Sequence, residues 1–228
     1  MNQDALARAR RIKLIAFDID GIMTDGTLFF GDDGQEYKGF NSLDGHGLKM
    51  LKGTGVELAI ITGRTSRVVE HRAKNLGIDI LHQGAHDKLA VYEALCKELN
   101  IACEDTAYMG DDVVDLPVMR RSGLAITVPA APDLVKAYSH YITRREAGRG
   151  AVREACETRL RGRYRLEVID IYQQPELAKK EQILAAPTLL RKLPLPLRKL
   201  VGDMSNKQKV IVGLELMPEK ESITEGKK

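Results

Sequence analysis

Residues 12–26 read IKLIAFDIDGIMTDG, an apolar run that stops at two aspartates, Asp18 and Asp20. A continuous apolar run of this length predicts a strand buried on both faces, as in a parallel sheet covered by helices. In open sheets of this kind, ligands bind beyond the carboxyl ends of the strands. The segment therefore predicts an α/β fold with a carboxylate-lined site directly after its first strand.

The rest of the first two thirds alternates short apolar runs with stretches of helical periodicity, which predicts a doubly wound parallel sheet with helices on both faces. Residues 26–40 are the exception, because Asp32, Asp33 and Gly34 between two apolar runs predict a β-hairpin insertion. We expect further strands at 56–61, 79–82, 106–109 and 124–127, and helices at 66–76, 88–99, 113–122 and 131–138.

Composition narrows the class of protein. The 228 residues are 43% hydrophobic and 29% charged, with a formal net charge of +3, as in soluble globular proteins. Aromatics make up 5% and tryptophan is absent, which argues against stacking on single-stranded nucleic acid. No apolar run is long enough to cross a bilayer, and the N-terminus lacks a signal-peptide pattern. We expect a cytoplasmic protein without nucleic-acid or membrane partners.

Five polar residues from four separate segments fall at one predicted edge of the sheet. Asp18 and Asp20 follow the first strand, Thr62 follows the second, Asp111 follows the run TAYMG, and Lys88 opens a helix. A single aspartate after a strand is usually a helix cap, but capping does not explain all five together.

These residue types suit one reaction. Asp18 can attack phosphorus as a carboxylate nucleophile, and Asp20 can act as general acid and base. Asp18 and Asp111 can supply oxygen ligands to Mg²⁺, while Lys88 and Thr62 hold the phosphoryl oxygens. The set predicts Mg²⁺-dependent phosphoryl transfer to water.

The motifs DIDGIMTDG, IITGR, GAHDK and GDDVVDLP resemble those of the haloacid dehalogenase (HAD) superfamily, whose sheet is Rossmann-like. Over about residues 8–155 the chain further resembles the 3-deoxy-D-manno-octulosonate 8-phosphate (KDO 8-phosphate) phosphatases. The resemblance implies that the metal is held by Asp18, Asp111 and the backbone carbonyl of Asp20. It also implies a supporting role for Asp115, beside Asp112, in orienting Lys88 or the waters on the metal.

The same resemblance implies hydrolysis of KDO 8-phosphate in the synthesis of lipopolysaccharide precursors. Arg64, Lys38 and Asn41 are the expected substrate contacts, and hairpins of neighbouring subunits are expected to assemble a homotetramer. A phosphatase of a related nine-carbon sugar acid phosphate stays open, because the motifs specify the reaction and not the sugar.

The last third of the chain has a different residue pattern from the first two thirds. Residues 159–216 contain the motifs VID, PELA, ILAAPTL, LPLPLRKLVGD and VIVGL in this order, and on these motifs they resemble the KaiB clock-protein family. The resemblance implies a thioredoxin-like fold, of which the first strand and most of the first helix are absent here. The resemblance implies a KaiC-type ATPase as a partner, so a KaiB-type interaction module on a carrier domain is the second functional hypothesis. The peptide bond before Pro187 could be cis or trans.

We expect a phosphatase domain over 1–157, a partial thioredoxin-like α/β module over 158–218 and a flexible tail over 219–228. Within the module, the pattern predicts a strand at 165–172, a helix opened by Pro175, short segments broken by prolines, and a helix at 205–216.

Overall fold

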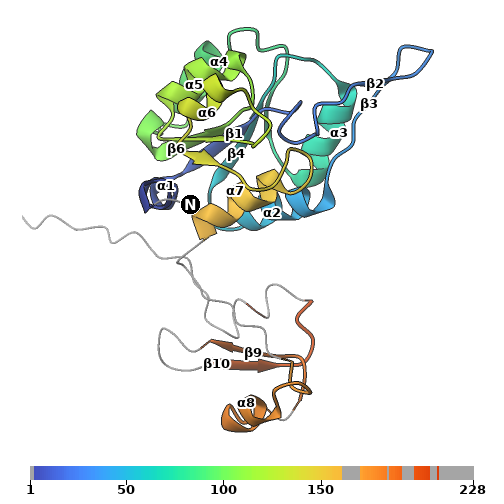
Figure 1. Cartoon of the computed structure of the whole chain (residues 1–228), viewed down its shortest axis with the longest axis vertical. Coiled ribbons are helices and arrows are strands. Elements are labelled where there is room, and N and C mark those ends of the chain that lie inside the picture. Colours follow the sequence, from blue (N-terminus) through green and yellow to red (C-terminus); the bar gives the residue numbers. More distant parts are fainter. Residues whose placement is uncertain (1–2, 161–169, 184, 192–197, 206–209, 211–228) are drawn as a thin grey trace, which may run out of the picture. The chain divides into compact units, whose positions relative to one another are not determined.

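The structure, a computed structural model, describes residues 3–160, 170–183, 185–191, 198–205 and 210 (Figure 1). The chain divides into two units, Met1–Arg165 and Leu166–Lys228, and each is described by itself. No helix in the described part of the chain is long and apolar enough to cross a membrane.

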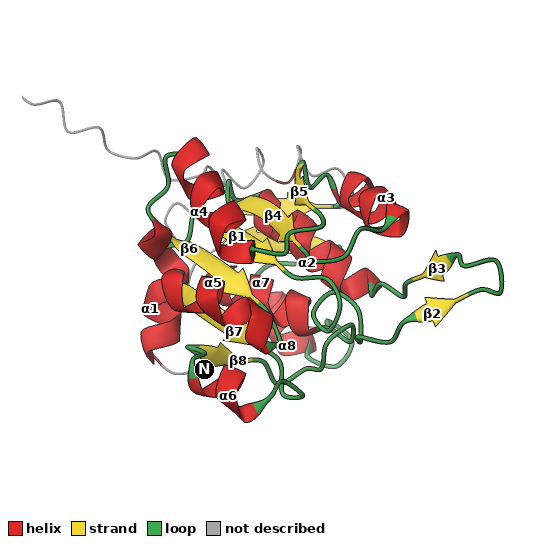
Figure 2. Ribbon diagram, turned by 90° about the horizontal axis from the view of Figure 1, so that it is seen from above, coloured by secondary structure: helices red, strands yellow, loops and turns green. Residues whose placement is uncertain are grey.

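The N-terminal unit is built on a six-stranded sheet in the order β5-β4-β1-β6-β7-β8, parallel throughout (Figure 2). Strands β1, β6 and β7 are buried along their whole length, as expected for a sheet covered on both faces. The five predicted strands are confirmed, and β8 at the sheet edge is an addition. The strands are β1 (Leu14–Phe17), β4 (Glu57–Ile61), β5 (Ile80–His82), β6 (Thr106–Met109), β7 (Leu124–Thr127) and β8 (Tyr141–Ile142).

Helices cover both faces of this sheet, as predicted. In Figure 1, α4, α5 and α6 lie on one side of it, and α1, α2 and α7 lie on the other. The predicted helix at 113–122 is divided into a 3-10 turn, η2 (Val113–Asp115), and α5 (Leu116–Arg121). The others are α1 (Gln3–Arg11), α2 (Ser42–Lys52), α3 (Arg67–Leu76), α4 (Lys88–Glu98), α6 (Asp133–Ala137), α7 (Ala151–Leu160) and the 3-10 turn η1 (Cys103–Asp105).

Helix α2 was not predicted from the sequence, because its glycines lower helix propensity. The structure explains Gly47, since a Cβ there would lie 3.0 Å from the Cα atom of Arg153 on α7. The glycine thus lets α2 and α7 pack closely. Asp44 of α2 accepts hydrogen bonds from the backbone N–H groups of Gly150 (3.2 Å) and Arg153 (2.7 Å), so it caps the start of α7.

The hairpin is confirmed as two short antiparallel strands, β2 (Phe29–Phe30) and β3 (Glu36–Tyr37). It extends away from the sheet and its helices in Figure 2. Four of its apolar side chains are 42–61% exposed: Leu28, Phe29, Phe30 and Tyr37.

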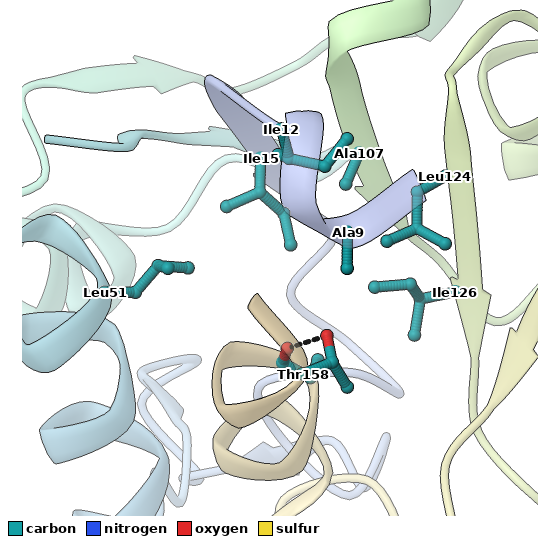
Figure 3. Close-up of a pocket in the computed structure, with 9 residues that line it drawn as sticks. Ala9, Ile12, Ile15, Leu51, Ala107, Leu124, Ile126 and Thr158 are labelled. Atoms are coloured by element: carbon teal, nitrogen blue, oxygen red, sulfur yellow. Dashed lines mark hydrogen bonds between the residues drawn. The ribbon is translucent and has the colours of Figure 1, made fainter. Parts of the chain in front are cut away.

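An apolar cavity of about 10 Å³ lies between the sheet and the helices α1, α2 and α7 (Figure 3). Ile15, Leu51 and Ile126 line it, and the hydroxyl of Thr158 donates to the carbonyl of Ala155 (2.6 Å). A space of this size and polarity is a packing void with no room for a substrate.

In the C-terminal unit, the predicted helix at Pro175 is confirmed as α8 (Pro175–Lys180). The proline-rich stretch contains an antiparallel pair, β9 (Thr188–Arg191) and β10 (Arg198–Val201). The peptide bond between Ala186 and Pro187 is cis.

Three other predictions for this unit concern residues outside the described ones. The strand predicted at 165–172 falls largely there, and its described residues 170–172 lie at a turn, with Asp170 accepting from the N–H of Tyr172 (2.8 Å). The predicted helix at 205–216 and the tail at 219–228 lie outside the described residues, apart from positions 205 and 210.

Candidate active site

The candidate residues lie where the strands β1, β4 and β6 end. Phe17 is in register with Ile60 on one side and Met109 on the other. The residues that follow these strands therefore meet at one edge of the sheet, where the strand order changes direction around β1. These residues are Asp18, Thr62 and Asp111.

Lys88, the first residue of α4, reaches into this edge and is buried. Its Nζ atom lies 3.1 Å from Asp18 Oδ2 and 2.7 Å from Asp115 Oδ1. Burial acts to lower the pKa of Lys88, but the two carboxylates outweigh it and raise the pKa above its usual value. Lys88 is thus a buried cation beside Asp18.

Asp115 is fully buried, and both of its oxygens are engaged. Oδ1 accepts from Lys88 and from the hydroxyl of Tyr108 (2.8 Å), while Oδ2 accepts from the N–H groups of Asp111 (3.0 Å) and Asp112 (3.2 Å). Asp112 is itself exposed and caps η2 through a bond from Val113 N (2.7 Å). Since its hydrogen-bonding capacity is used in this way, Asp115 is suited to orient Lys88 and the Asp111 loop.

Carboxylate oxygens of Asp18, Asp111 and Asp115 lie within 4.8 Å of one another. Burial and then the charge of Asp115 raise the pKa of Asp18 to about 6 and that of Asp111 to about 7. Asp111 Oδ1 is buried and accepts no hydrogen bond. A Cβ at Gly21, where φ is +87°, would lie 2.1 Å from Asp111 Oδ2. These carboxylates are crowded, one Asp111 oxygen has no hydrogen-bond donor, and the backbone of Gly21 lies next to it. Such a group of oxygens fits a hard divalent cation.

Asp20 belongs to a second cluster, formed with the base of the hairpin. Its Oδ1 accepts from Lys38 Nζ, and its Oδ2 lies 3.6 Å from Arg64 Nε. Glu36 Oε1 lies 3.1 Å from Lys38 Nζ and 3.0 Å from Arg64 Nη2. Lys38 and Arg64, two expected substrate contacts, thus lie beside the predicted acid/base.

Asn41 and Thr62 have local roles. Asn41 caps α2, with Oδ1 accepting from Leu43 N (2.8 Å), and its Nδ2 donates to the carbonyl of Gly148 (3.2 Å). Its side chain is therefore engaged in holding two loops together. Thr62 is buried at the end of β4, and its backbone bonds to residues 82 and 85 hold the loop that leads to α4.

Two residues of the site were missed from the sequence. Tyr108 reads as a core residue of its strand, and nothing in the sequence indicates its bond to Asp115. Glu36 had a signal, because alternation in QEYKGF places positions 36 and 38 on one side of the hairpin strand.

Comparison with protein-family models gives two matches. The family model for haloacid dehalogenase-like hydrolases matches residues 77–155, and the model for the KaiB domain matches residues 141–216. The KaiB match thus begins earlier than the expected residue 159 and overlaps the first match, although β8 and α7 lie in the N-terminal unit.

Relatives of known function cover most of this unit. The 3-deoxy-D-manno-octulosonate 8-phosphate phosphatase of Yersinia pestis is 44% identical over 164 residues, 72% of this chain and 88% of that protein. The enzyme of Escherichia coli K12 is 41% identical over 167 residues, 73% and 89% of the two chains.

Solved structures give the same result. The Moraxella catarrhalis enzyme, determined with magnesium, phosphate and KDO, superposes with a TM-score of 0.69 at 45% identity, over 70% of this chain and 92% of that one. The cobalt-bound enzyme of Haemophilus influenzae gives a TM-score of 0.65 at 35% identity, over 67% and 90% of the two chains.

The parallel sheet, with Asp18, Lys88 and Asp111 at its carboxyl edge, defines a haloacid dehalogenase-like phosphoric monoester hydrolase. More particularly, the chain belongs to the family of 3-deoxy-D-manno-octulosonate 8-phosphate phosphatases, and it carries a KaiB-like segment after that domain.

Proposed function

We propose that the protein hydrolyses KDO 8-phosphate to KDO and phosphate. The observation that carries the proposal is the buried contact of Lys88 with Asp18, beside the vacant oxygen of Asp111. Lys88 and a divalent-metal site at Asp111 would both lie next to Asp18. Their positive charges would favour attack of the Asp18 carboxylate on a phosphate group. The Moraxella relative, which holds magnesium, phosphate and KDO, supports this ligand set.

The reaction that we infer has two steps. An oxygen of Asp18 attacks phosphorus, the ester P–O bond breaks, and Asp20 gives its proton to the leaving oxygen. Asp20 then takes a proton from water, which attacks the aspartyl-phosphate and releases phosphate. Lys88 and Thr62 hold phosphoryl oxygens in both steps.

The residues that would hold Mg²⁺ are Asp18, Asp111 and the backbone carbonyl of Asp20. Bound there, the ion would neutralise charge on the phosphate and on the acidic cluster. Asp115 would orient Lys88, because its four hydrogen bonds leave no oxygen for the metal.

We assign the carboxylate of the sugar acid to Lys38 and Arg64, the two cations beside Asp20. Asn41 is three residues from Lys38 in the sequence. Because its side chain already bonds Leu43 N and the carbonyl of Gly148, it has only part of its hydrogen-bonding capacity left for a substrate. A nine-carbon sugar acid phosphate carries the same two anionic groups and is the alternative substrate.

The experiment is phosphate release from a panel of substrates, with Mg²⁺ and with chelator. KDO 8-phosphate, a nine-carbon sugar acid 9-phosphate, glucose 6-phosphate and phenyl phosphate separate the eight-carbon, nine-carbon, neutral-sugar and minimal substrates. We expect the highest kcat/KM with KDO 8-phosphate. A higher value for the nine-carbon compound would contradict the substrate assignment and leave the reaction class intact.

We also propose that the enzyme is a homotetramer assembled through the hairpin. A two-stranded element with four exposed apolar side chains is marginally stable alone, and pairing with other copies would bury them.

A second candidate function, binding of a KaiC-type ATPase, rests on the KaiB match over residues 141–216. Pull-down of a KaiC-type ATPase with the full chain, and with a chain that ends at residue 160, tests it. Capture by both chains alike, or by neither, would contradict this function.

A further inference from the structure

Four charged side chains form a closed cluster between the hairpin and the active site, which we call the hairpin ion cluster: Asp20, Glu36, Lys38 and Arg64. Lys38 contacts Asp20 Oδ1 and lies 3.1 Å from Glu36 Oε1. Arg64 lies 3.6 Å from Asp20 Oδ2 and 3.0 Å from the same Glu36 oxygen. Each cation is thus shared by the same two carboxylates.

The alternation of the hairpin strand explains how two charged residues, one position apart from Tyr37 on either side, reach the cluster. The side chains of Glu36 and Lys38 are 14% and 1% exposed, whereas Tyr37 between them is 56% exposed. Successive side chains of a strand point to opposite sides, so positions 36 and 38 face the site and position 37 faces away. The hairpin therefore delivers one acid and one base to the site.

Glu36 is the one member of the cluster to which the proposed function gives neither a catalytic step nor a substrate contact. Two cations held close together repel each other, and a carboxylate that accepts from both offsets this repulsion. Burial acts to raise the pKa of Glu36, but hydrogen bonds from neighbours that include Lys38 and Arg64 outweigh it and lower the pKa. Glu36 is thus an anion that stays paired with Lys38 and Arg64 while Asp20 acts as general acid and base.

We infer that Glu36 is a positioning residue, which holds Lys38 and Arg64 side by side as a receptor for the carboxylate of the substrate. The inference rests on the proposed function, since a sugar acid phosphate brings a second anion to the site. When that carboxylate binds, Lys38 and Arg64 keep Glu36 as a common partner, so their spacing is retained. Glu36 would then determine the preference for sugar acids over other phosphate esters.

The test compares two substrates that share the phosphate group and differ in the carboxylate, KDO 8-phosphate and phenyl phosphate. Glu36→Gln keeps the size of the side chain and removes its charge. We expect kcat/KM for KDO 8-phosphate to fall roughly tenfold or more, mainly through KM, as for loss of a charge-assisted contact. The fall for phenyl phosphate should be several times smaller. Glu36→Asp, which keeps the charge on a shorter side chain, should recover part of the loss.

Glu93→Gln is the matched control, because it removes an ion pair with Arg121 (3.1 Å) on the surface of α4. We expect both substrates to be hydrolysed by this variant as by the unaltered enzyme. Lys38→Met, alone and combined with Glu36→Gln, tests whether Glu36 acts through Lys38. If it does, the second substitution adds much less than it costs alone.

The outcomes separate this inference from the proposed function. If the unaltered enzyme does not prefer KDO 8-phosphate to phenyl phosphate, the substrate assignment fails and the inference fails with it. If the preference is present but Glu36→Gln lowers kcat/KM equally for both substrates, the inference alone is overturned. Full additivity with Lys38→Met would likewise overturn it.

Discussion

Lys88 and Asp115, 27 residues apart in the chain, form a buried ion pair with 2.7 Å between Nζ and Oδ1. The same Nζ atom lies 3.1 Å from Asp18, so one cation joins the first strand, the start of α4 and the loop after β6. A buried charge is tolerated only when it is paired and hydrogen-bonded, and Tyr108 supplies a further bond to Asp115. In the proposed reaction, this arrangement would present a cation to the phosphate without leaving Lys88 unpaired in the free enzyme.

Replacement of Asp18, the proposed nucleophile, should abolish turnover without unfolding the protein. Asp18→Asn has the same shape but cannot attack phosphorus, so we expect phosphate release to fall by roughly 10⁴-fold or more. Asp20→Asn should cost about 10²–10⁴-fold, as for loss of a general acid. Asp79→Asn, at an exposed ion pair with Lys52, is the control. Substantial phosphatase activity in the Asp18 variant would disprove its assignment as nucleophile.

Metal binding should depend on pH. With pKa values of about 6 and 7, Asp18 and Asp111 bind protons in the metal-free site, and these protons compete with Mg²⁺. The affinity for Mg²⁺ should therefore fall as pH decreases from about 8 to about 5, which lie roughly one unit above the higher pKa and one unit below the lower pKa. Calorimetric titration at both pH values measures this. Equal affinities would contradict the assignment of these carboxylates as ligands.

The same shifts predict the stability of the metal-free protein. The folded-state pKa values are raised, so the stability from these two groups is present at low pH and lost as pH rises through 6–7. In chelator at pH 8, Asp111→Asn should therefore raise the melting temperature by relieving repulsion, while it abolishes the increase that Mg²⁺ gives. Thermal melts with and without Mg²⁺ test both effects. An unchanged increase with Mg²⁺ in the variant would exclude Asp111 as a ligand.

The cap on α7 should be important for stability. Asp44→Ala removes the acceptor for the N–H groups of Gly150 and Arg153, and we expect a loss of about 2 kcal/mol in the free energy of unfolding. Urea unfolding measures it. Asp79→Ala, at an exposed position, should change the free energy by less than about 0.5 kcal/mol. Equal effects of the two substitutions would contradict a stabilising role for the Asp44 cap.

Assembly should depend on the hairpin. Combined Phe29→Ser and Phe30→Ser substitutions remove exposed apolar side chains that we expect other copies to cover, so the tetramer should dissociate. A chain that ends at Leu160 keeps the hairpin and should remain tetrameric. Light scattering on both proteins decides this. A monomer in the shortened chain would show that the C-terminal unit drives assembly.

The sheet and the acidic edge could be predicted because their signals are local. An apolar run of four to six residues predicts a buried strand by itself. Asp18 directly follows one such run, and Asp111 follows another after Gly110. Helix α2 could not be predicted in this way, because its glycines are unfavourable locally. They are explained only by other helices, since Gly47 packs against Arg153 of α7, about a hundred residues later, and Gly45 against Arg72 and Leu76 of α3.

Motif and spacing by themselves thus determined the fold class of the first unit, the reaction type and the residues that follow its strands. Tertiary structure alone decided that Tyr108 bonds Asp115, that Asp44 caps α7, and that Glu36 joins Lys38 to Arg64. The physical reason is distance along the chain. A strand or a turn is formed by neighbouring residues, whereas a buried ion cluster, or a cap supplied by another helix, exists only when different segments of the chain exclude water together.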